Sequence, residues 1–558
     1  MKKLNLLYPI LMLFILTSCN LDFSPTDGMS PEQLAKDPSG AAYMTDGNYS
    51  LFKDEFATSW SYASGDTYVR HFFLMSEYPS DNICLSGRTT DPLYEATCYK
   101  TNPTLANVTT LWWLGYKIIY GANSVIESIK DGADNQSDYI KGENYFLRAI
   151  CHLHLVTLYA KPYSLGRSNP GIVLRKSTDS SVTTRATVGE VYDQIAADLN
   201  EAIRLMSNGG TSRGNAGYAS KAAAQGLLTR VYLYMEENQK VVDLTNEMLG
   251  GADPSTKLEP TATFPKYFAN ALTSKETLWA IAHTSLESRE QSSIGSMYLN
   301  DVSGWGEVYS SDPLNNLYER YPSDIRYKFI VPVYNTTSTN YMITFPIASD
   351  GVDFRSNEIH DVTLDSGSGK YYFTINSVKI YVQTEIVNTY SQNFINYNGI
   401  KYIVRLTKKM VDRNTFPKYY ITKFSYQNNN PMLSSPVMIR WGEVILNRAE
   451  AYAKLSINDK ALADINIIRT RAGLSGDALF SISNMHGYSS VLDVVLDERR
   501  LELAFEGQRL FDLYRNKLNM DRQYAGVQPW EIINYDNGKI QYPIPSNEIL
   551  VSGIAQNK

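Results

Sequence analysis

The 558-residue sequence contains only four cysteines and six histidines, and its charged residues leave no positive surplus. Four cysteines are too few for a disulfide framework, although Cys84 and Cys98 could either pair in an oxidising compartment or remain free thiols. His152 and His154 lie two apart on one expected helix, on different faces, so they do not predict a shared metal ion. The sequence has no His-Glu-x-x-His run, phosphate-binding glycine loop or nucleophile elbow, so nothing in it calls for a metal or a cofactor. The net charge of -6 argues against nucleic acid as a partner.

The N-terminus has the composition of an export signal followed by a polar tether. Two lysines precede the leucine-rich run from Leu4 to Leu16, and two small residues precede Cys19. The apolar run is shorter than the roughly 20 residues that a membrane helix needs. The stretch Leu-Thr-Ser-Cys that ends at Cys19 resembles the bacterial lipobox, which implies acylation of that cysteine. The alternative is an ordinary secreted protein with a chance cysteine at this position. The expected boundaries are a signal peptide at 1–18, a tether at 19–30 and a single folded body at 31–558.

Apolar residues recur at steps of three and four in two blocks, residues 108–250 and 437–516, which predicts amphipathic helices. Thr187 and Glu190 have the spacing of a capping box and predict the start of one helix. Both blocks contain helix pairs with alanines where the two members would cross. Such pairs look like tetratricopeptide units, which stack because one pair alone cannot bury its apolar face. We therefore expect a mainly α fold in which degenerate tetratricopeptide-like pairs form one body.

Between the two blocks, residues 251–436 are richer in Gly, Ser, Asn and Pro. Alternating stretches at 327–334, 371–382 and 401–406 predict short strands. A long irregular insertion between regular blocks is usually functional. We expect this loop-rich region to contribute the ligand-binding face.

Residues 491–515 predict one amphipathic helix that carries charges within its apolar arc. Arg499, Glu502 and Glu506 fall in that arc at spacings of three and four, so they could pair along the helix. One hypothesis is a pair of acids for glycoside hydrolysis. The other is a buried ionic cluster that fixes how helices dock. A nearby arginine lowers carboxylate pKa values, whereas a general acid needs a raised pKa, so the structural hypothesis is favoured.

The segment LDERRLELAFEGQRLFDLYR, residues 496–515, resembles the C-terminal signature of the SusD/RagB family of bacterial outer-membrane nutrient-binding lipoproteins. Other segments follow in the family's order: FLRAICHLHLVTLYAKPY at 146–163, TVGEVYDQIAADLNEAI at 187–203, KAAAQGLLTRVYLYM at 221–235, IRWGEVILNRAEAYAKL at 439–455 and YPIPSNEIL at 542–550. Departures are modest: histidines replace the more usual aromatics in AICHLHL, and Trp441 replaces tyrosine.

The resemblance implies a helical body whose loops bind oligosaccharides, or peptides in some members. It also implies a cell-surface, lipid-anchored protein that acts as a lid on a SusC-like TonB-dependent outer-membrane barrel, without enzymatic activity. A surface glycosidase and a structural surface component stay as alternatives from other classes.

A shallow sugar site needs exposed aromatic rings for stacking and short polar side chains for hydrogen bonds. Two loop regions, 59–104 and 297–312, have that mixture, and the family resemblance favours the same places. The candidate ligand contacts are Trp60, Asp81, Asn82, Arg88, Tyr99, Trp305 and Tyr309. Asp81 and Arg88 could instead form a local salt bridge, and Trp305 could simply pack its own loop. Other tryptophans are expected in the core, namely Trp112, Trp279 and Trp441.

Overall fold

The computed structural model describes residues 39–54, 67–85, 87, 93–181, 183–299, 304–348, 355–387, 390–413 and 416–557. The expected signal peptide, Cys19, the tether, Trp60 and Arg88 lie outside these residues. Within the described part of the chain, none of the helices combines the length and the apolar character that crossing a membrane requires.

The first helical block is confirmed, and its helix starts follow the predicted capping residues. Its members are α6 (Ala106–Ser128), α7 (Asn135–Tyr159), α8 (Val188–Leu205), α9 (Lys221–Tyr234) and α10 (Asn238–Leu249). Thr187 and Glu190 form the reciprocal capping box at the start of α8. The N-terminal helices α3 (Gly40–Ser50) and α4 (Tyr68–Glu77) pack against α6.

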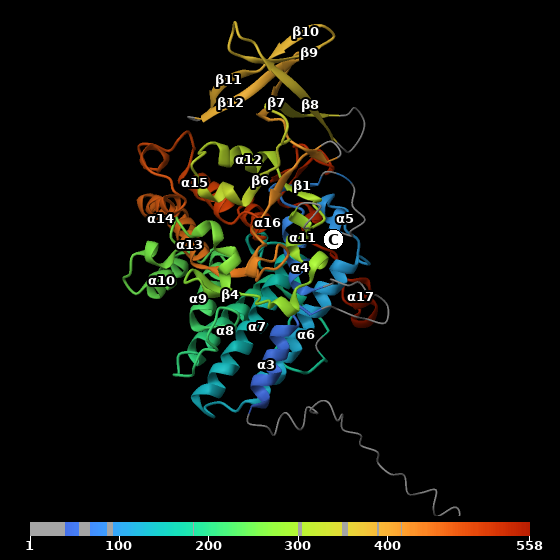
Figure 1. Cartoon of the computed structure of the whole chain (residues 1–558). Helices are drawn as coiled ribbons and strands as arrows, with labels where there is room; N and C mark the ends of the chain where they lie inside the picture. The colour runs from blue at the N-terminus through green and yellow to red at the C-terminus, as the bar shows by residue number, and fades with distance from the viewer. Residues whose placement is uncertain are drawn as a thin grey trace, which may run out of the picture.

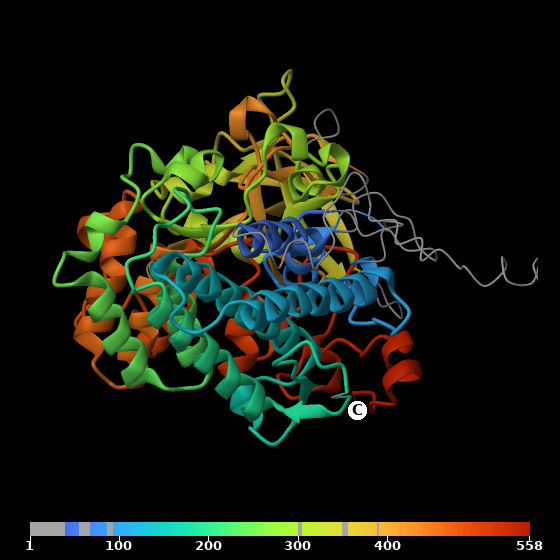
Figure 2. The same cartoon turned by 90° about the horizontal axis from the view of Figure 1, so that it is seen from below.

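The second block stacks on the first, although almost two hundred residues separate the two in sequence. It contains α13 (Trp441–Lys454), α14 (Asn458–Arg471), α15 (Val491–Glu502) and α16 (Arg509–Arg515). The pair α13 and α14 lies beside α9 and α10, as the orange and green helices of Figure 2 show. Gly226 of α9 lets strand residues of other segments approach the helix closely, because a Cβ there would meet Leu278 at 2.8 Å and Ile439 at 2.9 Å. This arrangement is the expected stacking of tetratricopeptide-like pairs.

The single helix predicted for residues 491–515 is instead two helices, α15 and α16, joined by a tight turn. Phe505 and Gly507 in that turn have φ values of 67° and 70°. A right-handed helix cannot continue through left-handed residues. The turn lies within the core, since Phe505 is only 1% exposed.

Short strands and small helices, some from the irregular region 251–436 and some from other parts of the chain, complete the fold. Two-stranded ladders join β1 (Ile83–Leu85) to β5 (Val308–Ser310) and β4 (Thr277–Ala280) to β18 (Val437–Arg440). The small helices are α5 (Leu93–Thr97), α11 (Ile294–Tyr298), α12 (Asp312–Glu319) and the C-terminal α17 (Ser546–Ser552). Three further short ladders pair β2 (Pro170–Val173) with β3 (Arg185–Thr187), β15 (Asp412–Arg413) with β16 (Phe416–Pro417), and β19 (Met520–Asp521) with β20 (Ile532–Ile533).

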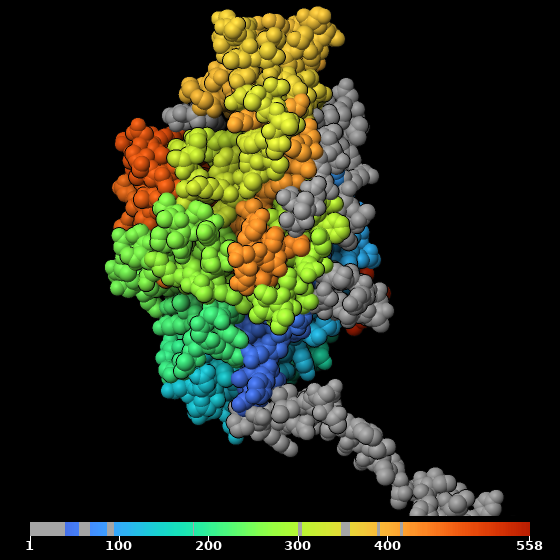
Figure 3. Space-filling model, viewed as in Figure 1, coloured from blue at the N-terminus to red at the C-terminus, as the bar shows by residue number. Residues whose placement is uncertain are grey.

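A β subdomain, residues 341–408, projects from this end on a two-stranded neck formed by β6 (Ile330–Pro332) and β17 (Tyr419–Ile421). It forms the gold top of Figures 1 and 3. Its strands are β7 (Tyr341–Ala348), β8 (Arg355–Leu364), β9 (Tyr371–Ile375), β10 (Val378–Tyr381), β11 (Gln383–Val387), β12 (Tyr390–Tyr397), β13 (Ile400–Ile403) and β14 (Arg405–Lys408). They form a five-stranded sheet in the order β10-β9-β8-β7-β14 and a three-stranded sheet in the order β11-β12-β13. The subdomain has a small core of its own, which includes Phe345, Phe373 and Ile395.

The structure confirms that three tryptophans lie in the core, and it shows whether Cys84 and Cys98 form a disulfide. Trp112, Trp279 and Trp441 are all at most 6% exposed. The cysteines at 84, 98 and 151 are buried free thiols, so Cys84 and Cys98 do not pair.

Candidate functional site

The Pro-Ser-Asp-Asn turn at residues 79–82, which carries two of the predicted ligand contacts, lies in the interior, against the C-terminal signature. Asp81 accepts hydrogen bonds from Arg509 Nε at 2.8 Å and Nη2 at 3.0 Å, and it forms an ion pair with Arg500 at 3.2 Å. Burial favours a higher pKa for the Asp81 carboxyl, but Arg500 and Arg509 hold it well below its usual range. Asn82 is 1% exposed and accepts from Arg500 Nε at 2.9 Å. The prediction of ligand contact at Asp81 and Asn82 is therefore wrong, because both side chains dock this turn onto α15 and α16.

Two predicted stacking tyrosines are also interior. Tyr99 is 8% exposed, donates to Pro79 O at 2.8 Å and lies 2.8 Å from the hydroxyl of Tyr514. Tyr309 lies on β5, is 0% exposed and donates to Gly306 O at 2.7 Å. Neither ring presents a face to solvent, so both are corrected to packing residues. Trp60 and Arg88 stay predictions, because they lie outside the described residues.

The acids considered for glycoside hydrolysis form a buried ionic cluster. Glu502 accepts from Arg440 Nη1 at 2.6 Å and from Arg326 Nη1 at 3.2 Å, and it is also paired with Arg471. Burial alone would raise the pKa of Glu502, but Arg471, Arg440 and Arg326 hold it well below its usual range. Glu506 has a lowered pKa for the same reason, with Arg440 and Lys423 as its partners. A carboxyl in this state cannot donate a proton near neutral pH, so the cluster holds helices together.

Arg499 is buried in the same interior. The helix spacing predicted that it could pair with Glu502, but its partners in the structure are different residues. It donates to Asp512 at 2.9 Å and 3.0 Å and to Asn447 at 2.8 Å. Because the predicted helix turns at Phe505, Asp512 on α16 folds back beside α15. The prediction of a buried ionic cluster is confirmed. Spacing along one helix did not predict which residues pair in it, because the partners lie on other elements.

Among the predicted site residues that the structure describes, Trp305 lies at the surface, with 50% of its area exposed. Its indole Nε1 donates to Gln291 O at 2.9 Å, and its backbone N donates to Ser296 O at 2.6 Å. The flanking glycines make this fit possible: a Cβ on Gly304 would collide with the Ser296 carbonyl, and Gly306 has φ of 56°. The ring is thus held in one orientation while half of the residue stays open to solvent.

A second exposed aromatic, Tyr426, is carried by a loop that packs on the same short helix, α11. Gly295 of α11 lies against Phe424 O, and the Phe424 ring stacks on Tyr298 with centroids 5.8 Å apart. Tyr426 is 47% exposed and has φ of 70°, a left-handed conformation that costs free energy for a non-glycine residue. Such strain is found more often at functional sites than elsewhere.

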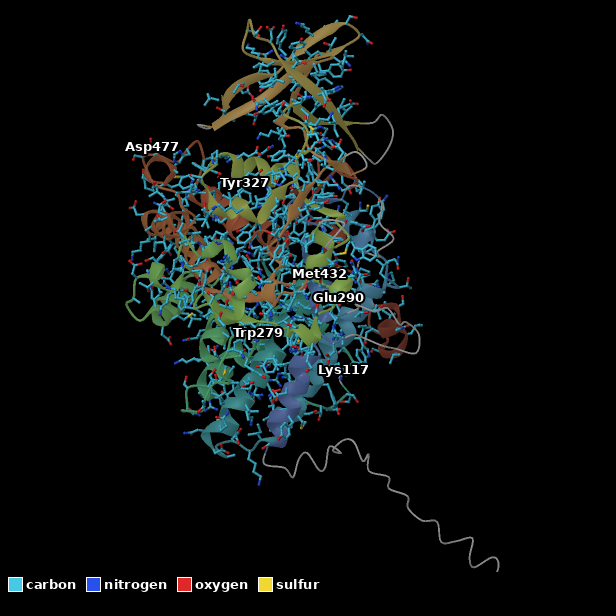
Figure 4. The ribbon with its side chains drawn as sticks, viewed as in Figure 1. Lys117, Trp279, Glu290, Tyr327, Met432 and Asp477 are labelled. Atoms are coloured by element: carbon cyan, nitrogen blue, oxygen red, sulfur yellow. The ribbon has the colours of Figure 1, made fainter. Side chains whose placement is uncertain are left out.

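We call this surface the α11 platform: residues 291–293, Trp305 and Tyr426, which rest on the buried helix α11. Its helix begins with Ser293, whose hydroxyl caps the backbone N–H of Ser296. The same segment forms one wall of a shallow hollow, near the labels Glu290 and Met432 in Figure 4. The other residues that line the hollow include Arg70, Arg289 and Ser434. Hydroxyl and guanidinium groups hydrogen-bond to polyols, and the exposed Trp305 ring is bonded to Gln291, the residue before Ser292 in the wall of the hollow.

The sequence pointed to Trp305 through a loop that mixes aromatic and short polar residues, but it did not point to Tyr426. The signal was available in Tyr426-Gln-Asn-Asn-Asn430, a run of asparagines typical of left-handed turns. Within the described residues, no cluster of three or more His, Cys, Asp or Glu side chains could hold a metal ion.

The fold and this surface together define a tetratricopeptide-like helical scaffold that carries aromatic side chains on a loop-rich face. The chain belongs to the SusD family, whose profile matches residues 275–557. A second profile, described as starch-binding and associating with the outer membrane, matches residues 61–233.

Individual relatives agree along nearly the whole chain. The sequence is 24% identical to the SusD-like protein P2 of Formosa agariphila over 99% of this chain and 98% of that protein. A SusD superfamily crystal structure from Bacteroides thetaiotaomicron has a TM-score of 0.69 at 20% identity, over 93% of this chain and 99% of that one. A laminarin-binding SusD-like protein has a TM-score of 0.59 at 19% identity, over 94% and 99%. At these identities the solved structures establish the fold.

Proposed function

We propose that this protein is a surface-exposed outer-membrane lipoprotein that captures oligosaccharides at the α11 platform and delivers them to a SusC-like TonB-dependent transporter. The half-exposed Trp305 ring, fixed by its bond to Gln291 O, is the observation that carries the proposal. A ring held in place stacks on the C–H face of a sugar without first losing side-chain freedom. Membership of a family with starch-binding and laminarin-binding relatives supports a glycan as the ligand.

The protein binds its glycan and does not cleave it. The buried acids that could have served hydrolysis have lowered pKa values and no open face. Affinity is modest, because an open platform leaves much of the ligand hydrated. Incubation of the purified body with a bound glycan should therefore release no reducing sugar.

The Trp305→Ala variant tests the site. We expect the affinity for the best glycan found on a broad array to fall by about tenfold, because stacking on one aromatic ring is lost. Isothermal titration calorimetry measures this change. Trp113→Ala is the matched control, since Trp113 is another partly exposed tryptophan, at 39%, on α6.

Two results would contradict the proposal. Equal affinity in Trp305→Ala and the wild type would place the glycan elsewhere. Binding of oligopeptides, with no glycan bound at any concentration tested, would favour a peptide-binding member of the same architecture.

A further inference from the structure

A second pocket lies far along the chain from the α11 platform and shares none of its residues. It has a volume of about 210 Å³ and is lined by residues of α6, of the segment 173–180 and of α17. We call it the α6 pocket. The elements α6 and α17 lie next to each other at the right of Figure 1.

Hydrogen bonds inside the protein fix the walls of the α6 pocket. Tyr116 of α6 donates to Val173 O at 2.8 Å. Asn123, about two helical turns further along α6, donates to Ser177 O at 2.8 Å. Glu548 of α17 accepts from the Trp112 indole at 3.3 Å. The pocket is therefore built before any ligand arrives.

Several polar groups in the α6 pocket keep hydrogen-bonding capacity for a ligand. Among the described residues, Arg175 uses only Nη1, in a bond of 3.3 Å to Asp179 O, so Nε and Nη2 have no protein acceptor. Glu548 has a carboxylate with lone pairs beyond those its two protein donors use. The Tyr116 hydroxyl donates to the backbone and can still accept.

Tyr120 provides the apolar face. It follows Tyr116 by one helical turn, lines the pocket and is 58% exposed. An exposed ring that lines a pocket is poorly explained by packing within the chain, because burying it elsewhere would stabilise the fold.

The chemistry of these groups selects the class of ligand. A guanidinium beside a carboxylate binds vicinal hydroxyls, since each hydroxyl can accept from one and donate to the other. The lining carries one positive side chain, Arg175, and two negative ones, Asp179 and Glu548, so it disfavours anionic sugars. A volume of about 210 Å³ is below the usual range for drug-sized ligands and accommodates about one sugar ring.

We propose that the α6 pocket is a second saccharide site that holds a single neutral sugar unit, stacked on Tyr120 and hydrogen-bonded by Arg175 and Glu548. This inference rests on the proposed function, because it assigns a further contact to the same glycan ligand. It adds a contact point outside the α11 platform and raises the affinity for glycans, or for branched chains, that reach both.

The experiment uses the whole folded body and the array glycan bound by the wild type, with glucose, galactose and mannose as single-unit probes. Calorimetry measures stoichiometry, and saturation-transfer NMR detects the single units. In a Trp305→Ala background we expect residual binding of the single units. Adding Tyr120→Ala should weaken that binding about fivefold, and adding Arg175→Ala should weaken it more than tenfold. Tyr43→Ala is the matched control, because Tyr43 is a comparably exposed tyrosine, at 56%, on α3.

The outcomes separate this inference from the proposed function. If the wild type binds the array glycan, and if the Tyr120→Ala and Arg175→Ala variants keep its full affinity and stoichiometry, the second site does not exist while the proposed function stands. If the wild type binds no glycan on the array, both are overturned. Unchanged melting temperatures in the two variants confirm that any loss is a loss of binding.

Discussion

At the scale of single residues, Glu502 is a buried carboxylate held by three arginines. It is 1% exposed and faces the guanidinium groups of Arg326, Arg440 and Arg471. Glu502→Gln keeps the shape but leaves three buried cations with one less negative charge. We expect the free energy of unfolding to fall by about 3 kcal/mol, because breaking a buried pair leaves charge uncompensated. Urea denaturation measures the change.

The control for this prediction is Asp477→Asn, which also neutralises one carboxylate. Asp477 is exposed and is labelled at the upper left of Figure 4. Its variant should lie within about 0.5 kcal/mol of the wild type. Similar effects in the two variants would mean that the cluster contributes little beyond ordinary surface charge.

Glu77 makes the stability of the protein fall as pH rises, because its pKa is higher in the folded state than in the unfolded state. It is 0% exposed, and its carboxylate accepts from Asn82 at 3.1 Å and from the backbone of Gly507 at 2.9 Å. Burial raises its pKa to about 7, more than these hydrogen bonds lower it. Between its ordinary value and pH 7 the folded state keeps a proton that the unfolded state has released. The contribution of Glu77 to stability therefore falls as pH rises through this window and is constant above it.

The measurable consequence is a difference between the wild type and Glu77→Gln. From pH 4.5 to pH 7.5, the wild type should lose about 3 kcal/mol of unfolding free energy relative to the variant. Denaturation series at both pH values give the two differences. A constant difference would show that Glu77 has the same ionisation in the folded and unfolded states.

Local pattern identified some site residues and misled on others for a physical reason. The glycines on either side of Trp305 adjoin it in the sequence, so its loop could be predicted from the local sequence alone. Asp81 is satisfied by Arg500 and Arg509, more than 400 residues away, and no local spacing encodes that contact. A polar residue in a loop looks the same in sequence whether it meets a ligand or a distant arginine.

At the scale of elements, helices were well predicted where caps and periodicity agreed, as at Thr187. The break between α15 and α16 was missed, because an apolar run continues through the turn. The strands of the β subdomain were partly predicted from alternation at 371–382. Their pairing was not, since β7 joins β14 across more than fifty residues of chain.

The β subdomain should be removable without unfolding the body. Its own core is separate from the main one, and Thr344 of β7 pairs directly with Arg405 of β14. Replacing residues 345–404 by Asn-Gly closes the remaining β7–β14 ladder with a hairpin turn of suitable twist. We expect a melting temperature within a few degrees of the wild type and unchanged glycan binding at the α11 platform. Calorimetry and titration check both.

Arg405 is deliberately kept in that deletion. Its guanidinium donates to Asn316 at 2.7 Å and Glu319 at 2.5 Å, both on α12 of the body. Arg405→Ala in the full chain serves as the comparison and should cost about 2 kcal/mol. If the deletion variant loses cooperative unfolding while Arg405→Ala does not, the subdomain is an integral part of the body.

At the scale of the whole molecule, the proposed function requires two binding surfaces, the α11 platform and the α6 pocket, and a lipid anchor at Cys19. The α11 platform and the α6 pocket are both built on helices that the main core holds in place. Rigid elements suit a receptor that must hold cargo for a partner, since little ordering is required when the glycan binds. The remaining requirement is that the body stays at the membrane.

The anchor is tested by Cys19→Ser. If the Leu-Thr-Ser-Cys stretch is a lipobox, acyl chains on Cys19 hold the body on the outer membrane, at about 0.8 kcal/mol per buried methylene. Serine cannot receive them, so the variant should lose label from radioactive palmitate and move from the detergent phase to the aqueous phase. Ser18→Ala keeps a small residue before the cysteine and should remain acylated. A Cys19→Ser protein that still partitions into detergent would show that another feature of the chain binds the membrane.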